Sequence, residues 1–362
     1  MKTRNIEKVL VTGGAGFIGS HVAEFYAQKG CDVTVFDNLS RAQLLGKGNR
    51  NIMYNWGYLK NYHNVKLVKG DITNLEQLEK ACNDVEAIVH TAAQTAVTMS
   101  LTDPQTDFST NTLGTFNVLE VARKSESNPA VIYCSTNKVY GDNVNKINIV
   151  ENKTRYVFEN KFKNGIPETF PIDLCEHTPY GCSKLAGDLY VQDYSRTYGL
   201  KTAVFRMSCI YGTRQFGVED QGWVAWFTIA TITGTPITIY GNGKQVRDVL
   251  YVSDLVDAYD AFLQRRNELS GEVFNLGGGS ENTLSLLELL DMLETLTGKR
   301  SKVIFSDWRP SDQKVYISNI SKAKEKLGWT PKNSPKIGVE KLVNWFLENK
   351  QCIKWLKVVE QA

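Results

Sequence analysis

Residues 9–21 read VLVTGGAGFIGSH, an apolar run rich in β-branched residues that meets a cluster of glycines, and an amphipathic segment follows to residue 29. This order predicts a strand, a tight turn and a helix. Gly13 permits the turn, Gly16 lets the backbone approach a pyrophosphate, and Gly19 lets the helix pack closely on the strand. The N-terminus of the helix then faces the anion, so the stretch predicts a phosphate-binding turn.

A second predicted strand, residues 31–36, ends at Asp37. A dinucleotide-binding fold places a carboxylate at this point to hold the adenosine ribose. That carboxylate would repel a ribose 2′-phosphate, so NAD is favoured over NADP, although Arg41 nearby weakens the preference. A glycine-rich surface turn is the plainer interpretation of the glycines alone, but strand, helix and Asp37 together predict dinucleotide binding.

The composition is that of an ordinary globular protein of 362 residues. The formal net charge of +3 is slight and no basic block occurs, so nucleic acid is not an expected partner. No apolar run reaches the ~20 residues of a membrane span, and the chain enters a strand too early for a signal peptide. Seven scattered cysteines and four histidines predict reduced thiols, a cytoplasmic enzyme and no metal site.

Strands and helices alternate along the first half of the chain, which predicts an α/β, Rossmann-like, doubly wound parallel sheet. A helix is expected over residues 111–123, and the further strands of this part are expected at residues 65–68, 87–90, 130–134 and 202–207. His90 lies inside an apolar strand and is interpreted as a core histidine with satisfied hydrogen bonds. Asp71 follows a strand end, where it can accept a bond from the adenine amino group, cap a helix, or do both.

The composition changes after residue 207, whereas a strand at residues 273–276 is expected to rejoin the first sheet. We therefore expect an NAD-binding domain from residues 1–207 and 247–278. A smaller substrate-binding α/β domain is expected from residues 208–246 and 279–362. The polar and aromatic stretch 142–178 is too long for a simple connection, and the sequence assigns it no role.

Tyr180 and Lys184 are four residues apart on a predicted helix, so they share one face. A phenol has a pKa near ~10 and is a poor base at neutral pH. The ammonium group of Lys184 and the positive nicotinamide ring would favour the phenolate. Thr136, at the end of the strand at 130–134, can hydrogen-bond the same substrate hydroxyl. Tyr-x-x-x-Lys occurs by chance on many helices, but its position downstream of the glycine turn and Thr136 predicts a proton-transfer site.

Together, the glycine turn, Thr136, Tyr180 and Lys184 resemble the extended short-chain dehydrogenase/reductase family, in its nucleotide-sugar epimerase/dehydratase branch, over nearly the whole chain. Within that branch, STNKVYG at 135–141 and QGWV at 221–224 resemble enzymes that act on CDP-linked sugars. This resemblance implies NAD-dependent inversion at C2 of a CDP-3,6-dideoxyhexose through a transient 2-keto sugar, with NAD held tightly. Epimerisation at C4 or C5 of another nucleotide sugar is the alternative. The presence of all three catalytic candidates argues against a regulator that binds NAD without turnover.

The resemblance also implies which residues hold the ligands. Arg247 and Arg309 are candidates for the diphosphate, because bidentate guanidinium groups suit phosphate oxygens, and a surface ion pair is the alternative for each. Residues expected at the cofactor are Gly13, Gly16, Phe17, Ile18, Asp37, Asn38, Ser40, Arg41, Asp71, Ile72, Ala92, Ala93, Gln94, Asn111, Ser135, Tyr180, Lys184 and Met207. Residues expected at the substrate are Gln94, Thr136, Ser208, Gln215, Phe216, Trp223, Gln245, Arg247, Arg309 and Asp312.

Two departures from the family pattern narrow the reaction. A sugar 4,6-dehydratase of this family carries Asp-Glu after the active-site Thr, whereas this chain has Asn137 and Lys138, which disfavours dehydration. Family 4-epimerases carry an Asn where this chain has Ser208 or Cys209, which argues against simple 4-epimerisation. By the same resemblance, the helix at 111–123 is expected to form a homodimer face, and a homotetramer is the alternative.

Overall fold

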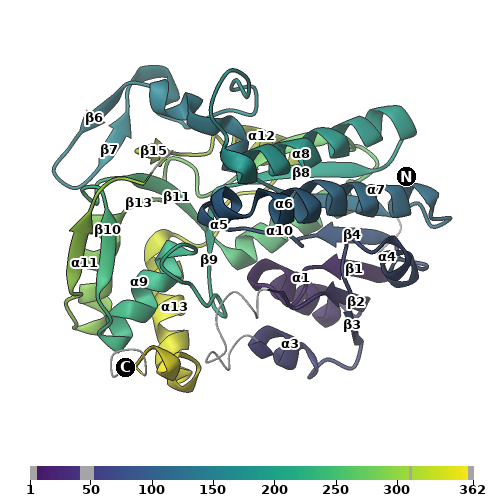
Figure 1. Cartoon of the computed structure of the whole chain (residues 1–362), viewed down its shortest axis with the longest axis horizontal. Coiled ribbons are helices and arrows are strands. Elements are labelled where there is room, and N and C mark those ends of the chain that lie inside the picture. The colour runs from purple at the N-terminus through teal and green to yellow at the C-terminus, as the bar shows by residue number, and fades with distance from the viewer. Residues whose placement is uncertain (1–5, 41–52, 310–311, 358–362) are drawn as a thin grey trace.

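The computed structural model describes residues 6–40, 53–309 and 312–357. Its centre is a parallel sheet of seven strands in the order β12-β8-β5-β4-β1-β2-β3 (Figure 1). The strands are β1 (Lys8–Thr12), β2 (Asp32–Asp37), β3 (Val65–Lys69), β4 (Ala87–His90), β5 (Ala130–Thr136), β8 (Thr202–Met207) and β12 (Glu272–Leu276). The predicted return of the strand near residue 273 to this sheet is confirmed, because β12 pairs in parallel with β8.

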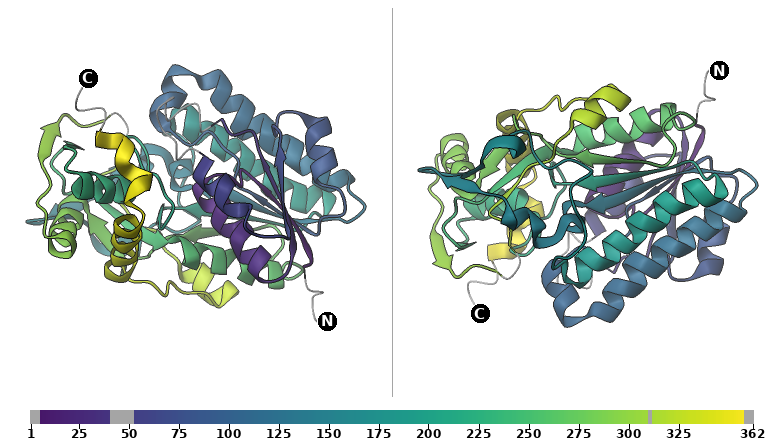
Figure 2. Two further views of the ribbon diagram at one scale, coloured as in Figure 1. Left: turned by 90° about the horizontal axis from the view of Figure 1, so that it is seen from below. Right: turned by 90° about the horizontal axis from the view of Figure 1, so that it is seen from above.

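Helices cover both faces of this sheet (Figure 2). Side chains alternate between the faces along a strand, so Val9 and Val11 of β1 enter one core and Leu10 the other. The first core is closed by α1 (Phe17–Gln28), α10 (Val252–Gln264) and α12 (Ser321–Leu327), and the second by α4 (Leu75–Ala81), α7 (Gly114–Lys124) and α8 (Thr178–Tyr198). The predicted doubly wound α/β fold is confirmed.

Two helices begin differently from the sequence expectation. Helix α1 starts at Phe17, directly after the glycine turn, with Gly16 as its N-cap. The helix expected from Asn111 begins as one π-helical turn, Ser109–Leu113, and continues as α7. Short helices α5 (Val97–Thr102) and α6 (Pro104–Phe108) precede that turn. None of the helices within the described ranges is both long and apolar enough to cross a membrane.

A second group of strands lies at the other end of the molecule (Figure 1). Strand β11 (Val246–Tyr251) pairs with β9 (Cys209–Tyr211), β13 (Thr283–Ser285) and β15 (Val315–Tyr316), and β10 (Ile237–Tyr240) pairs with β14 (Val303–Ser306). Helices α9 (Trp223–Thr233), α11 (Leu286–Thr297) and α13 (Pro335–Glu348) share a hydrophobic core with them. Strand β11 thus belongs to this group, whereas α10, which follows it directly, packs on the central sheet.

The stretch at 142–178 is folded rather than extended. A 3-10 segment, Asn137–Lys146, leads into a hairpin of β6 (Ile149–Glu151) and β7 (Tyr156–Phe158). Its buried side chains Tyr140, Val144 and Phe158 share a core with Val246 and Tyr316. The stretch therefore packs onto the second group of strands, beside the carboxyl end of β5.

Candidate active site

The glycine turn is packed directly against the end of β4. Gly13 has φ +70°, and its amide donates to the Phe36 carbonyl at 2.8 Å. A Cβ atom at Gly13 would lie 2.5 Å from the Ala92 amide nitrogen, and one at Gly19 would overlap the Gly13 carbonyl oxygen. These positions exclude any side chain, so they leave a cradle of bare backbone at the N-terminus of α1, as the sequence predicts.

Asp37 lies at the carboxyl end of β2, beside this turn. Its carboxylate accepts bonds from the amides of Ala15 at 2.9 Å and Leu39 at 2.7 Å. Burial, together with the nearby Asp71 carboxylate, raises the pKa of Asp37 above its ordinary value. The side chain of Asn38 donates to Asp71 at 2.8 Å, which ties the ends of β2 and β3 together. The acids predicted at the adenosine are thus neighbours, whereas Arg41 lies outside the described residues.

Tyr180 and Thr136 come together at the carboxyl end of β5. Burial raises the pKa of Tyr180 to about 12, and a side-chain hydrogen bond with Thr136 acts in the opposite direction. Lys184, one turn along α8, is 3% exposed, and its ammonium lies 4.2 Å from the centroid of the Tyr133 ring. Burial lowers the pKa of Lys184 to about 8. Burial removes water from both Tyr180 and Lys184. In the protein without its cofactor, the pKa of Tyr180 is therefore raised, although the sequence predicts that Lys184 favours the phenolate.

A buried network of polar side chains fixes the start of α8. Asn111 donates to Asp107 and Ser183, each at 3.1 Å, and its side-chain oxygen accepts from the Gln94 amide at 2.9 Å. The Tyr180 amide in turn donates to a serine hydroxyl on α5 at 3.1 Å. The side chains of Gln94 and Asn111 thus form hydrogen bonds within the protein. Their predicted contacts with cofactor or substrate stay predictions. The sequence analysis missed Asp107 and Ser183 as members of this network.

Ser135 points into a buried ion pair. Its hydroxyl donates to Asp188 at 2.7 Å, and Arg206 donates to the same carboxylate oxygen at 2.9 Å. Asp188 is fully buried and Arg206 is 4% exposed. The hydroxyl of Ser135 is therefore committed to this pair, so a contact with the cofactor would have to come from its backbone. His90 likewise bonds two threonines through both ring nitrogens and is a core histidine, as predicted.

Both arginines predicted at the diphosphate carry a carboxylate partner. Arg247 lies 3.0 Å from Asp312, and Arg309 lies 2.9 Å from Asp220. The Arg309 guanidinium also lies 3.8 Å from the centroid of the Tyr240 ring. The structure therefore brings Arg247 and Asp312 together. It also shows that the ion pairs weighed as the alternative do form.

The remaining residues predicted at the substrate divide into two groups. The Trp223 indole donates to Cys209 Sγ at 3.3 Å, and the Gln245 amide donates to the Tyr240 carbonyl at 2.7 Å. Ser208 donates to a backbone carbonyl of β11 at 3.1 Å. Phe216, in contrast, packs in the second core against Tyr54, Trp345 and Phe346. Phe216 was predicted to line the substrate pocket, but its ring contacts three other aromatic rings and lies in the second hydrophobic core.

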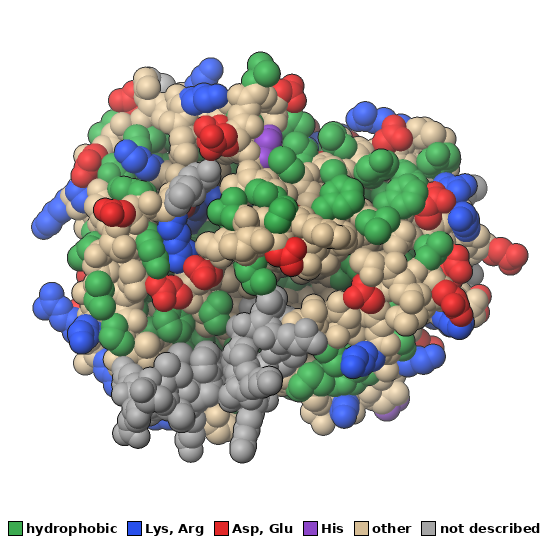
Figure 3. Space-filling model, in the orientation of Figure 1, with side chains coloured by type: hydrophobic (Ala, Val, Ile, Leu, Met, Phe, Trp, Pro, Cys, Tyr) green, Lys and Arg blue, Asp and Glu red, His purple; other side chains and the backbone are tan. Residues whose placement is uncertain are grey.

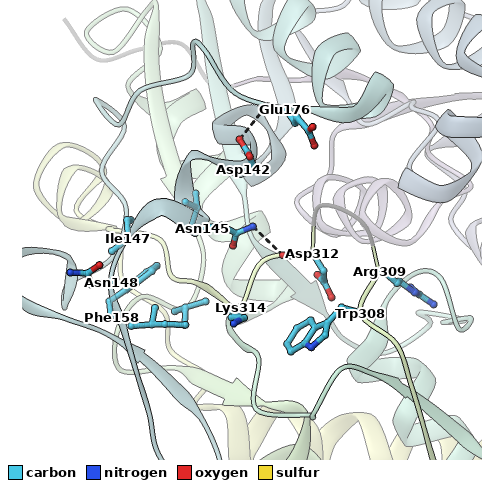
Figure 4. Close-up of a pocket in the computed structure, with 13 residues that line it drawn as sticks. Asp142, Asn145, Ile147, Asn148, Phe158, Glu176, Trp308, Arg309, Asp312 and Lys314 are labelled. Atoms are coloured by element: carbon cyan, nitrogen blue, oxygen red, sulfur yellow. Dashed lines mark hydrogen bonds between the residues drawn. The ribbon is translucent and has the colours of Figure 1, made fainter.

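A cavity of about 570 Å³ lies between the 142–158 stretch and the segment that carries Arg309 and Asp312 (Figure 4). Asn145 reaches across it and donates to the Asp312 carbonyl at 3.1 Å. Trp308, Lys314 and Phe158 form much of its wall. Neither Thr136 nor Tyr180 lines it, whereas Arg309 and Asp312, which are predicted to bind the nucleotide, do.

Comparisons with known proteins agree with this geometry. Residues 9–277 match the model of the NAD dependent epimerase/dehydratase family. The chain belongs to this family. It is 42% identical to CDP-paratose 2-epimerase from Salmonella typhi over 345 residues, which cover 93% of this chain and 98% of that protein.

Solved structures of other members of the NAD dependent epimerase/dehydratase family superpose on nearly the whole chain. UDP-glucose 4-epimerase from Thermotoga maritima, solved with UDP-glucose, has a TM-score of 0.77, 32% identity and coverage of 95% of this chain and 99% of its own. UDP-glucuronic acid 4-epimerase from Bacillus cereus, solved with UDP-glucuronic acid and NAD, has a TM-score of 0.78, 26% identity and coverage of 94% and 99%. The resemblance to extended short-chain dehydrogenase/reductases is confirmed.

As a member of the NAD dependent epimerase/dehydratase family, this enzyme uses NAD. Its own residues fit that cofactor, because the bare backbone at Gly13 forms a cradle that a Cβ atom would fill. Asp37 stands at the strand end where the adenosine ribose would lie. Further residues predicted at NAD occupy the same rim: Phe17 and Ile18 begin α1, Ala92 and Ala93 follow β4, and Met207 ends β8.

Proposed function

We propose that this enzyme inverts C2 of a CDP-3,6-dideoxyhexose and so interconverts CDP-paratose and CDP-tyvelose. The observation that carries this proposal is the 42% identity, over almost the full length of both chains, to CDP-paratose 2-epimerase of Salmonella typhi. Asn137 and Lys138 support it, because neither side chain can supply the carboxyl group that a dehydratase of this family uses.

The chain's own residues move the proton in this reaction. Thr136 and Tyr180 share a hydrogen bond and both can meet one sugar hydroxyl, so Thr136 orients it and Tyr180 removes its proton. When bound, NAD supplies the hydride acceptor and donor for the sugar carbon. The positive charge of its nicotinamide ring would oppose the pKa of about 12 that burial gives Tyr180.

Inversion requires the 2-keto sugar to turn its other face before it is reduced again. Its nucleotide must stay bound during this movement, since release would leave the enzyme reduced. Arg247, Arg309 and Asp312 hold the diphosphate and ribose in this proposal, and the cavity beside them gives the nucleotide room. In this proposal, the retention of the substrate depends on the second group of strands and the chemistry depends on the central sheet.

A 4-epimerase is the second candidate. The chain is 33% identical to a putative UDP-glucose 4-epimerase from Methanocaldococcus jannaschii and 32% identical to UDP-glucuronate 4-epimerase from Thermodesulfobacterium geofontis. The two candidates separate when purified enzyme is incubated with CDP-paratose, CDP-glucose and UDP-glucose. Proton NMR then reports the configuration at C2 and C4. Inversion of CDP-paratose at C2 supports the first candidate, and inversion of UDP-glucose with CDP-paratose unchanged discards it.

A further inference from the structure

The buried carboxylate of Asp188 joins three elements of the central sheet and its helices. Asp188 lies on α8, about two turns beyond Tyr180. One of its oxygens accepts bonds from the Ser135 hydroxyl of β5 at 2.7 Å and from Arg206 Nε of β8 at 2.9 Å. The other oxygen accepts from Arg206 at 3.1 Å and from the Gln192 amide of α8 at 2.7 Å. A fully buried carboxylate needs such a set of donors, and here they come from β5, β8 and α8.

Helix α8 packs on β5 without room for adjustment. A Cβ atom at Gly187 would lie 2.4 Å from the hydroxyl oxygen of Tyr133. That hydroxyl donates to the Lys184 carbonyl at 3.1 Å. Tyr133 and Ser135 are two residues apart on β5, so both side chains leave the same face of the sheet toward α8. The strand is thus bonded to the helix twice in its last four residues, and the second of these bonds is made by the residue before Thr136.

The guanidinium of Arg206 keeps the Asp188 carboxylate in one orientation. Arg206 stands opposite Ser135 in the register of β5 and β8. Besides Asp188, it donates to the Tyr140 hydroxyl at 3.2 Å, and that hydroxyl donates to Asn275 of β12 at 2.7 Å. The acceptor that Ser135 bonds is therefore held by a partner that is itself fixed to two further elements.

We infer that Ser135 is a positioning residue, whose bond to Asp188 holds the end of β5 on α8. It thereby fixes the Thr136 hydroxyl relative to the Tyr180 phenol, so that both meet one sugar hydroxyl. This inference rests on the proton-transfer roles proposed above for Thr136 and Tyr180. Ser135 and Thr136 are adjacent, so a shift of the one backbone moves the other. A displacement of about 1 Å at a reacting group can lower a rate by about 100-fold.

A matched pair of variants separates positioning from stability. Ser135→Ala and Gln192→Met each remove one bond of 2.7 Å to the Asp188 carboxylate, but only Ser135 is joined to Thr136. With CDP-paratose as substrate, Ser135→Ala should lower kcat about 10- to 100-fold and leave KM within about threefold. Gln192→Met should match the wild type in both constants. Urea unfolding and NAD content check that both variants are folded and loaded.

A second measurement does not depend on the substrate. Crystal structures of the NAD-loaded wild type and of both variants give the distance between the hydroxyl oxygens of Thr136 and Tyr180. We expect this distance to change by about 0.5 Å or more in Ser135→Ala alone. An unchanged distance, full turnover in Ser135→Ala, or an equal loss of turnover in both variants overturns the inference. If the wild type leaves CDP-paratose unchanged, the proposed reaction fails, and the distance alone decides the role of Ser135.

Discussion

The Asp220 carboxylate holds the Arg309 guanidinium at 2.9 Å while that guanidinium stacks on the ring of Tyr240. Tyr240 also donates through its hydroxyl to Glu219 at 3.1 Å, and Gln221 donates to Thr95, which follows β4. Three consecutive residues thus connect the second group of strands with the rim of the central sheet. Arg309 must leave Asp220 to give its full charge to a phosphate.

Replacing Asp220 by Asn should therefore tighten the binding of CDP. The Arg309–Asp220 ion pair is half-exposed, so it stabilises the free enzyme by at most about 1 kcal/mol. Its removal should therefore lower the dissociation constant for CDP about two- to fivefold. Isothermal titration of the NAD-loaded enzyme measures it, with Asp193→Asn on α8 as the control. Weaker binding by Asp220→Asn would mean that Asp220 holds Arg309 ready for the ligand instead of competing with it.

Tyr180→Phe should keep NAD and lose turnover. The substitution removes only the buried hydroxyl that shares a hydrogen bond with Thr136, so the helix and the cofactor cradle stay intact. A lost general base predicts a fall in turnover of roughly a thousandfold. NMR of the sugar reports turnover, and absorbance of the extracted cofactor reports NAD content. Tyr190→Phe, an exposed tyrosine of the same helix, serves as control, and substantial activity in Tyr180→Phe would remove this residue from its role.

The sequence predicted those parts of the site that depend on neighbours along the chain. The glycine turn, Asp37 at a strand end and the helical spacing of Tyr180 and Lys184 are all local patterns, and the structure contains each of them. The raised pKa of Tyr180 was missed because it depends on how much water the fold removes, which spacing along a helix does not report.

Residues whose partners are distant in the sequence were predicted less well. Phe216 was assigned to the substrate by family resemblance, but its ring packs against Tyr54 and Trp345, which are distant from it in the sequence. The side chain of Asn111, which lies in a π-helical turn, bonds Asp107 and Ser183, and these partners were not predicted. No periodicity in the sequence marks such a turn, since one extra residue per turn shifts every later side chain.

Gly19→Ala should abolish NAD binding. A Cβ atom at this position would overlap the Gly13 carbonyl oxygen and crowd the Gly14 backbone, so α1 would have to move away from the turn. Gly57→Ala on α3 (Tyr54–Leu59) is the matched control, because nothing lies within 4 Å of a Cβ atom there. We expect Gly19→Ala to be purified without NAD and to melt at lower temperature, and Gly57→Ala to match the wild type in both. A Gly19→Ala protein with full NAD content would contradict the close packing.

The buried, neutral side chain of His90 should make the protein less stable to unfolding in acid. Burial lowers its pKa to about 3 from an ordinary value near 6.5, so the folded state keeps it neutral where the unfolded state binds a proton. Unfolding therefore takes up a proton between these values, and the free energy of unfolding falls by about 1.4 kcal/mol for each pH unit as the pH drops below 6.5. Gln can bond both threonines without titrating, so urea unfolding of His90→Gln should show a shallower pH slope. The exposed His63→Gln should keep the wild-type slope.

The outer face of α7 and α8 predicts a dimer. Phe116 and Tyr190 are 36% and 44% exposed and their ring centroids lie 5.9 Å apart, with Leu113 and Leu189 beside them along the helices. Figure 3 shows hydrophobic side chains gathered over these helices. Such a patch is typical of a surface that a second copy covers.

Phe116→Asp combined with Leu189→Asp should give a monomer by sedimentation equilibrium, whereas Leu347→Asp, on exposed α13 surface, should not. A wild-type monomer, or a dimer that survives the double substitution, would exclude this face. Asn111, in the π-helical turn before α7, and Tyr180, on α8, lie on the buried side of this face. Separating the two copies should therefore lower both the melting temperature and the turnover. The affinity for CDP depends on the second group of strands and should stay within about threefold of the wild type.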